Sequence, residues 1–88
     1  MRGFSSSPLL RCGRMKRTLQ ERVGLAIRKR REALKYSQDD FADHVDMHRS
    51  YYGNVERGQK NLQLSTLERV CKGLDCPIWE VMRDAESQ

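Results

Sequence analysis

Apolar residues recur at helical spacing along the chain and predict five short helices. Val23 and Ile27 lie one helical turn apart, and Phe41, Ala42 and Val45 form a second apolar face. The later apolar stripes have the same period and comprise Tyr52 and Val55, then Leu64, Leu67, Val70, Cys71 and Leu74, and finally Ile78, Val81 and Met82. These stripes predict an all-α fold, a compact five-helix bundle with the stripes in its core.

Capping residues mark the ends of these helices. Thr18 and Glu21 have the spacing of a capping box, so the first helix should begin there and end near Leu34-Lys35. Ser37 is a suitable N-cap, Gly58 a suitable C-cap, and Pro77 suits a first helical position. The expected helices cover about 18–34, 38–45, 49–57, 64–73 and 78–82.

Residues 37–58 form a unit of two short helices joined by a tight turn. Asp46 tolerates the left-handed conformation that such a turn needs, and the small Ala42 lets the second helix cross closely. The outward face of the second helix is polar and rich in hydrogen-bond donors, with Arg49, Ser50, Gly53 and Asn54. This arrangement predicts a helix-turn-helix that recognises DNA.

The same stretch resembles the lambda-repressor-like helix-turn-helix family, the Cro/repressor or xenobiotic-response-element class. The resemblance covers about Val23 to Met82, and its most specific parts are Ser37-Gln38 with Phe41-Ala42 and the ending Glu56-Arg57-Gly58. Further matching positions are Ile27-Arg28, Arg31, Asp40, Val45, Met47, Arg49-Ser50, Val55, Leu64, Leu67 and Leu74. The resemblance implies this fold and binding to double-stranded DNA.

The resemblance also implies a structural ion pair between Arg31 and Glu56, which would join the first helix to the third. Removing one partner of such a buried pair costs about 3–5 kcal/mol. The family usually has Gly or Asn at the position of Lys35. If that residue is left-handed, Lys35 costs about 1 kcal/mol.

Four residues of the third helix are the candidates for reading bases. Arg49 has the fork geometry that suits guanine O6 and N7, and Asn54 suits adenine N6 and N7 or a phosphate. Ser50 is short but can reach a base edge. Tyr51 could contact phosphate, a thymine methyl group or apolar protein surface. The alternative interpretation is that these side chains form only a solvated face.

A second set of residues is expected at the DNA backbone. Gln38 begins the second helix, where free N–H groups and the helix dipole favour phosphate, and the resemblance favours the same contact. His48 is a plausible cap of the third helix. The expected phosphate contacts are Ser37, Gln38, His48, Arg57, Lys60 and Asn61.

The charge of the chain is unevenly distributed. Residues 1–17 hold five of the 17 Lys and Arg residues and no acidic residue, so residues 18–88 are neutral with 12 basic and 12 acidic side chains. We expect residues 1–17 to be a disordered basic segment, either an arm that contacts DNA or a passive leader that precedes a start at Met15. Residues 18–83 would be the DNA-binding domain and 84–88 a frayed tail.

Little in the sequence indicates a metal site, a cofactor site, a membrane span or an enzyme. The three Cys residues (Cys12, Cys71 and Cys76) are an odd number without zinc-finger spacing, so reduced thiols in a cytoplasmic protein are expected, without metal or other cofactor. No membrane span, small-molecule ligand or enzymatic motif is predicted.

The predicted function is that of a small stand-alone transcriptional regulator of bacterial or phage type. A single module of this kind binds DNA weakly, so a homodimer on a palindromic operator is expected. Trp79, Val81 and Met82 in the fifth helix are the candidates for the dimer contact. The alternatives are a module that binds a protein partner through that helix, as an antitoxin would, and a redox or metal sensor that uses Cys71 and Cys76.

Overall fold

The computed structural model describes residues 17–59 and 61–88. Its helices are α2 (Leu19–Ala33), α3 (Gln38–His44), α4 (Arg49–Arg57), α5 (Leu64–Leu74) and α6 (Ile78–Glu86), and the described residues contain no strand. The predicted all-α five-helix bundle is confirmed. The expectations for residues 1–16 and for Lys60 lie outside the described residues.

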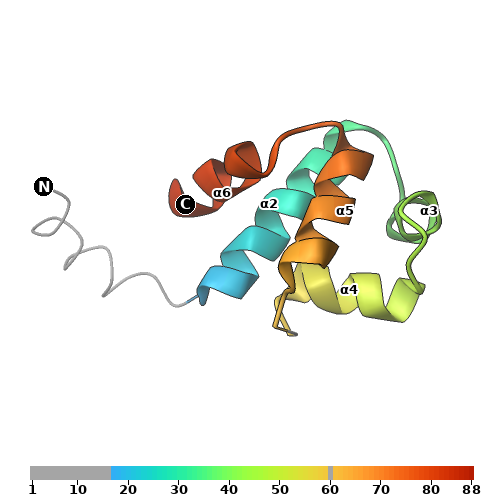
Figure 1. Cartoon of the computed structure of the whole chain (residues 1–88), viewed down its shortest axis with the longest axis horizontal. Helices are drawn as coiled ribbons and strands as arrows, with labels where there is room; N and C mark the ends of the chain where they lie inside the picture. Colours follow the sequence, from blue (N-terminus) through green and yellow to red (C-terminus); the bar gives the residue numbers. More distant parts are fainter. Residues whose placement is uncertain (1–16, 60) are drawn as a thin grey trace, which may run out of the picture.

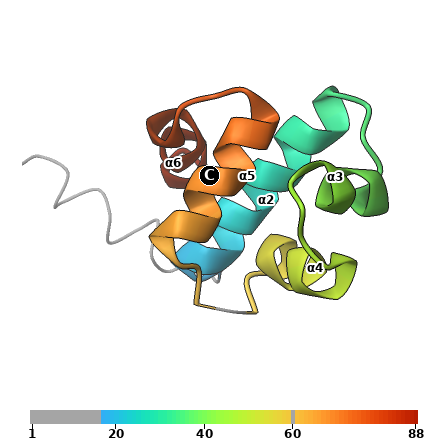
Figure 2. The ribbon, with the colours of Figure 1, turned by 45° about the vertical axis from the view of Figure 1, so that its right-hand side comes forward.

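The helices surround α2, which packs most extensively against α6 and α4. In Figure 1, α2 and α5 occupy the middle, α6 lies on one side, α3 lies on the other side, and α4 runs across the lower end. Figure 2 shows the same order from another direction, with α3 and α4 together and α6 apart from them. The helix-turn-helix of α3 and α4 thus lies on the side of the molecule away from α6.

The predicted caps are present. The Thr18 hydroxyl accepts a hydrogen bond from the Glu21 backbone N–H at 3.2 Å, while the Thr18 N–H donates to the Glu21 carboxylate at 2.8 Å. The Ser37 hydroxyl accepts from the Asp40 N–H at 3.0 Å. Gly58 caps α4 in the left-handed conformation, with φ of 70°.

Three other residues with side chains, Lys35, Asp46 and Asp75, take the left-handed conformation between helices. Asp75 has φ of 60° and caps α5. Asp46 has φ of 59° in the turn between α3 and α4, as predicted. Lys35 has φ of 70° in the turn after α2. Because a left-handed residue with a Cβ costs about 1–2 kcal/mol, Lys35 is a strained position, whereas Asp46 has a short polar side chain that suits it.

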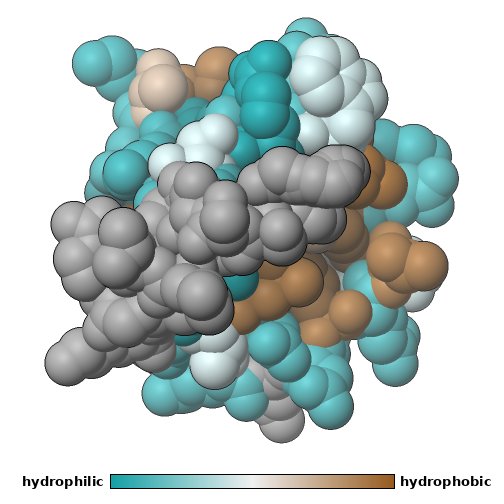
Figure 3. All heavy atoms as spheres, turned by 90° about the vertical axis from the view of Figure 1, so that its left-hand side faces the viewer, coloured by the Kyte–Doolittle hydropathy of each residue, from teal (hydrophilic) through white to brown (hydrophobic). Residues whose placement is uncertain are grey.

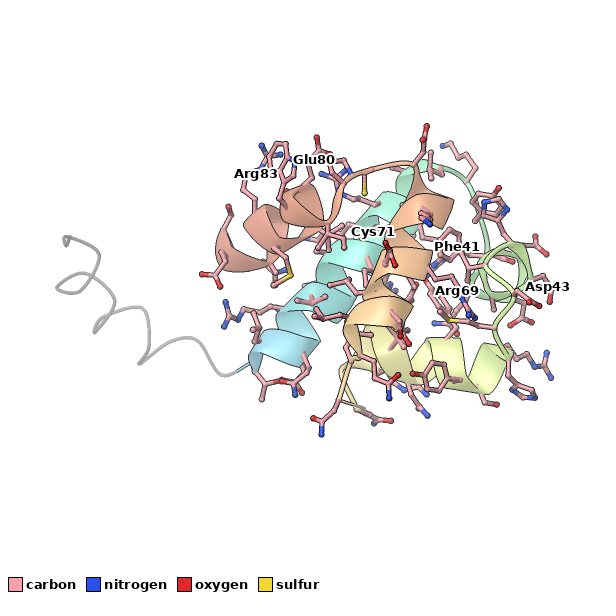
Figure 4. All side chains as sticks on the ribbon, viewed as in Figure 1. Phe41, Asp43, Arg69, Cys71, Glu80 and Arg83 are labelled. Atoms are coloured by element: carbon pink, nitrogen blue, oxygen red, sulfur yellow. The ribbon has the colours of Figure 1, made fainter. Side chains whose placement is uncertain are left out.

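One apolar core joins all the helices. Its largest fully buried side chains are Tyr52, Phe41, Ile27, Val70, Val81 and Cys71. Figure 4 shows Phe41 directed from α3 toward the interior and Asp43 directed outward from the same helix. The periodic stripes predicted most of this core, because positions one helical turn apart share a face.

The backbones of α2 and α4 touch at Gly24. A Cβ atom at this position would lie 2.2 Å from the carbonyl oxygen of Glu56 and 2.6 Å from that of Val55. Both distances are far below van der Waals contact with fixed backbone atoms. Only glycine therefore fits where α2 crosses the end of α4, and the orientation of α4 is fixed by backbone contact.

Two predictions about the core and the C-terminal end are wrong. Leu64 was expected in the core but is 79% exposed, because it lies in the first turn of α5 and the buried stripe begins at Leu67. The expected frayed tail at 84–88 is also wrong, because α6 continues to Glu86. Ala85 is fully buried, and the Gln88 side chain donates to the Arg22 carbonyl at 2.8 Å.

Candidate nucleic-acid interface

The two faces of α4 differ sharply in exposure. Tyr52, Val55 and Glu56 are buried against the rest of the bundle. On the other face Arg49 and Ser50 are exposed and Asn54 is half-buried. The helix thus presents polar side chains to solvent from a backbone that is fixed from behind, which is the arrangement that readout in a major groove requires.

His48 begins α4 as its N-cap, as predicted. Its Nδ1 atom accepts a hydrogen bond from the Ser50 N–H at 3.1 Å. This contact occupies Nδ1 and leaves Nε2 available for an outside partner. The His48 side chain is exposed, so its expected phosphate contact is sterically open.

Arg49 is paired with a carboxylate from the neighbouring helix. Its Nη1 atom lies 3.1 Å from Oδ2 of Asp39, in the first turn of α3. The Arg49 side chain is 70% exposed and that of Asp39 is 61% exposed. Sequence reasoning missed Asp39, because the ten-residue separation of the two residues matches no helical spacing and only the fold brings them together.

A buried network holds α2, α3 and α4 together. Arg31 donates to both carboxylate oxygens of Glu56, from Nε at 2.7 Å and from Nη2 at 3.1 Å. The same carboxylate accepts from the Tyr52 hydroxyl at 2.5 Å and from the Gln38 amide at 3.0 Å. The ion pair that the family resemblance implied is therefore present, and Tyr52 and Gln38 complete it.

The network changes the acid–base properties of its members. Burial by itself raises the pKa of Glu56, but the hydrogen bonds from Arg31, Tyr52 and Gln38 outweigh burial, and its pKa lies below the ordinary value. The pKa of Arg31 is raised by its hydrogen bond to Glu56. Burial, followed by the hydrogen bond to Glu56, raises the pKa of Tyr52 well above its ordinary range. The carboxylate is therefore charged and fully bonded.

Gln38 thus has a structural contact as well as a place at the expected DNA surface. It is the first residue of α3 and is half-buried, and its amide nitrogen donates to Glu56. Ser37 caps the same helix end and is exposed. The free N–H groups at this helix end remain the feature that favours phosphate.

The remaining candidates are Tyr51 in the first turn of α4, Asn54 and Arg57 farther along it, and Asn61 beyond its C-terminal end. The Arg57 Nη2 atom donates to Asn54 Oδ1 at 2.7 Å. Asn61 accepts from the Gln20 amide of α2 at 3.1 Å. Tyr51 is half-buried and packs against the core, with its hydroxyl 3.4 Å from that of Thr66 in α5.

The expected dimer residues on α6 differ in position. Trp79 is 60% exposed, with the Arg83 guanidinium 5.3 Å from its ring centroid, and Met82 is half-buried. Val81 is fully buried in the core, so its prediction as a contact to a partner is wrong. The space-filling view toward this side shows hydrophobic surface among hydrophilic side chains (Figure 3).

Ion pairs anchor α6 to α2. Arg30 lies 2.8 Å from Asp84 and 3.2 Å from Glu80, and the hydrogen bond to Asp84 is the main cause of its raised pKa. Figure 4 shows Glu80 and Arg83 on the outer side of α6. Trp79 is thus carried on a helix held by several contacts.

The thiols of Cys71 and Cys76 are not activated. Burial raises the pKa of Cys71 to about 11, and burial also raises the pKa of Cys76. Within residues 17–59 and 61–88, no group of three or more His, Cys, Asp or Glu side chains is placed to hold a metal ion. None of the described helices is long and apolar enough to cross a membrane.

Comparison with known proteins places this geometry in a family. The sequence profile of the family described as Helix-turn-helix matches residues 27–78. The control protein C.MunI of Mycoplasma sp is 35% identical over 68 residues, which are 76% of this chain and 92% of that protein.

Solved structures agree with the sequence comparison. The restriction-modification controller protein C.AhdI from Aeromonas hydrophila superimposes with a TM-score of 0.68 at 34% identity, covering 70% of this chain and 94% of that one. The controller protein C.Esp1396I, solved as a tetramer in complex with its natural 35 base-pair operator, gives a TM-score of 0.72 at 26% identity, covering 83% and 100%. The chain belongs to the helix-turn-helix family of DNA-binding regulators, together with the controller proteins of restriction-modification systems.

Proposed function

We propose that this chain is a controller protein of a restriction-modification system, which regulates transcription by binding an operator in duplex DNA. The observation that carries the proposal is the fixed backbone of α4. Gly24 and the Arg31–Glu56 pair hold it from behind, while Arg49 and Ser50 are exposed in front. This arrangement supports base readout by the N-terminal half of α4 and gives no support to an enzymatic role.

Phosphate contacts would orient α4 in the groove. The candidates are Ser37 and Gln38 at the start of α3, His48 at the start of α4, and Arg57, Lys60 and Asn61 at its far end. In this proposal they set the register of the protein on DNA, while Arg49, Ser50, Asn54 and Tyr51 supply sequence preference. Such a regulator would work in the cytoplasm, where its operator lies.

The operator is proposed to contain an inverted repeat that binds a homodimer. Residues 18–88 carry no net charge, so this part of one copy has little general attraction for phosphate. Two copies that insert α4 into successive major grooves, about 34 Å apart, would add their contacts. The exposed Trp79 and the neighbouring Met82 are the proposed dimer contact.

A selection of bound sites from a random duplex pool tests the function and the symmetry together. An enriched inverted repeat, bound with an affinity that falls steeply with salt, is the expected result. Absence of duplex binding even at low salt would overturn the proposal. It would favour the second candidate, a module that binds a protein partner, for which the 60% exposure of Trp79 is the supporting observation.

Sedimentation equilibrium tests whether Trp79 is a homodimer contact or is left for another protein partner. The parent chain should be dimeric at micromolar concentration, and Trp79→Ala should shift the equilibrium toward monomer. Lys72→Ala, an exposed residue on α5, is the matched control. A dimer that Trp79→Ala leaves unchanged would exclude this residue from the interface.

A further inference from the structure

The side chain of Arg57 covers the middle of α4, although its own Cα lies at the end of the helix. A Cβ atom added to Gly53 would lie 3.2 Å from Nη1 and 3.4 Å from Nη2 of Arg57. Long side chains on a helix lean toward the preceding turn, so the residue at 57 covers the residue at 53. Gly53 is buried, because this guanidinium group fills the space over it.

Polar contacts hold this guanidinium in place. Its Nη2 atom donates to Asn54 Oδ1 at 2.7 Å, and its Nε atom lies 3.5 Å from Gln59 Oε1. The amide oxygen of Gln38 lies 3.5 Å from the same point above Gly53. The group thus lies on the outward surface of α4, beside the first residue of α3.

The partners of Arg57 are neutral, unlike those of two other arginines in this region. Arg49 is paired with Asp39, and Arg31 with Glu56. Among the described residues, no carboxylate lies within ion-pair distance of Arg57. No carboxylate of the described residues therefore neutralises the positive charge of Arg57, and no ion pair has to break before Arg57 contacts DNA.

Resting on the proposed DNA-binding function, we propose that Arg57 reads a guanine from the space above Gly53, with Gly53 and Asn54 as its positioning residues. A guanidinium fork donates two parallel hydrogen bonds to guanine O6 and N7. The Asn54 carbonyl oxygen, which would accept from adenine N6 in a bidentate pair, accepts from Arg57 here. Asn54 therefore acts through Arg57 rather than as an independent adenine reader.

This proposal replaces the assignment of Arg57 to phosphate and of Asn54 to direct base reading, and the two assignments of Arg57 differ measurably. A phosphate contact requires the side chain to turn away from the middle of α4 toward the DNA backbone. Its removal would weaken binding to all duplexes alike. A guanine contact would instead be lost at one base pair in each half-site, with a tenfold or greater fall in preference at that pair.

The substitution Gly53→Ala tests whether Arg57 must lie over Gly53 to read the guanine. The added methyl group would lie 3.2 Å from the Arg57 guanidinium, which is the far end of a flexible side chain and must move aside by a few tenths of an ångström. Alanine is also the better helix former, so urea unfolding should show the variant as stable as the parent or more stable. The variant keeps every charge, so the salt dependence of its affinity for random duplex should match that of the parent.

The full experiment measures the parent chain, Gly53→Ala, Arg57→Ala and the double variant against the selected operator and its single base-pair changes. Both single variants should lose preference for the same guanine, about tenfold or more, and the double variant should match Arg57→Ala. Lys72→Ala controls for the loss of one positive charge.

Three results would overturn the proposal. Arg57→Ala could weaken all duplexes equally, Gly53→Ala could keep the parent's preference, or Gly53→Ala could weaken binding as much without Arg57 as with it. If the parent itself binds no duplex, the proposed function fails as well, so the two failures are distinguishable.

Discussion

Asp39 and Arg49 form an ion pair across the helix-turn-helix, with 3.1 Å between the Asp39 carboxylate and the Arg49 guanidinium. The pair joins the first turn of α3 to the first turn of α4, where the proposed base-reading residues begin. An exposed pair of this kind contributes about 0–1 kcal/mol, so it orients Arg49 without holding it strongly. In the proposed DNA complex, the Asp39 charge would approach the DNA together with Arg49.

The first prediction concerns this charge. Asp39→Asn should raise the affinity for random duplex about twofold to fivefold at low salt, because a negative charge next to the DNA surface is removed. Fluorescence anisotropy at two salt concentrations measures the effect. Glu68→Gln, an exposed residue of α5, is the control. An equal gain in that control would mean that only net charge matters.

The second prediction concerns Arg49 itself. Arg49→Ala should reduce discrimination at one base pair of each half-site by about 1–3 kcal/mol, because a bidentate contact to guanine is lost. Binding to operators that differ at single positions measures this. An unchanged preference at every position would remove Arg49 from the reading residues.

A third prediction addresses the buried network. Tyr52→Phe should lower the free energy of unfolding by about 1–3 kcal/mol, because Glu56 loses a hydrogen bond to a charged group while the apolar ring is retained. Urea unfolding at neutral pH measures the loss. Tyr36→Phe is the control, since Tyr36 also packs against the core and its backbone carbonyl accepts from Arg31. A Tyr52→Phe variant as stable as this control would show that the hydroxyl contributes nothing.

The fourth prediction is the pH dependence of stability. The pKa of Glu56 is lower in the folded chain than its ordinary value, so the unfolded chain takes up the proton first as the pH falls. The contribution of Glu56 to stability is therefore complete above its unfolded pKa, about 4.3, and is lost as the pH falls toward its folded pKa. Unfolding free energies measured from pH 6 to pH 3 should decline, and the decline should be shallower in Tyr52→Phe. A steeper decline in that variant would contradict this assignment.

The fifth prediction uses the strained turn after α2. Lys35→Gly should raise the free energy of unfolding by about 1 kcal/mol, because φ at this position is 70° and glycine adopts it without a Cβ clash. Lys35→Ala removes the same charge but keeps the Cβ, so it should give no gain. Equal gains in both variants would assign the effect to charge instead.

The sequence predicted the helices and their caps well because these depend on near neighbours. Thr18, Ser37, His48 and Gly58 each act within a few residues, and the prediction for each is confirmed. Leu64 was placed wrongly in the core because the periodic pattern does not say where a core ends. The pattern placed Val81 in the core correctly, and only its choice as a dimer contact was wrong. The burial of both residues depends on which helices cover them.

The interface was less predictable, because its contacts join positions that lie far apart or depend on side-chain direction. The Asp39–Arg49 pair exists only after α3 and α4 have packed. Arg57 lies over Gly53 because long side chains on a helix point toward the preceding turn. The four-residue spacing between Gly53 and Arg57 could therefore have indicated this contact from the sequence. The roles of these residues on DNA remain proposals that the variants above test.

The backbone contact at Gly24 has a consequence for the evolution of this regulator. Because α4 is oriented by main-chain atoms of α2 and by an ion pair on its inner side, its outer side chains can change without altering its angle to the bundle. New operator preferences can then arise by single substitutions at the surface. A regulator and its target site could in this way diverge together, one base pair at a time, on an unchanged scaffold.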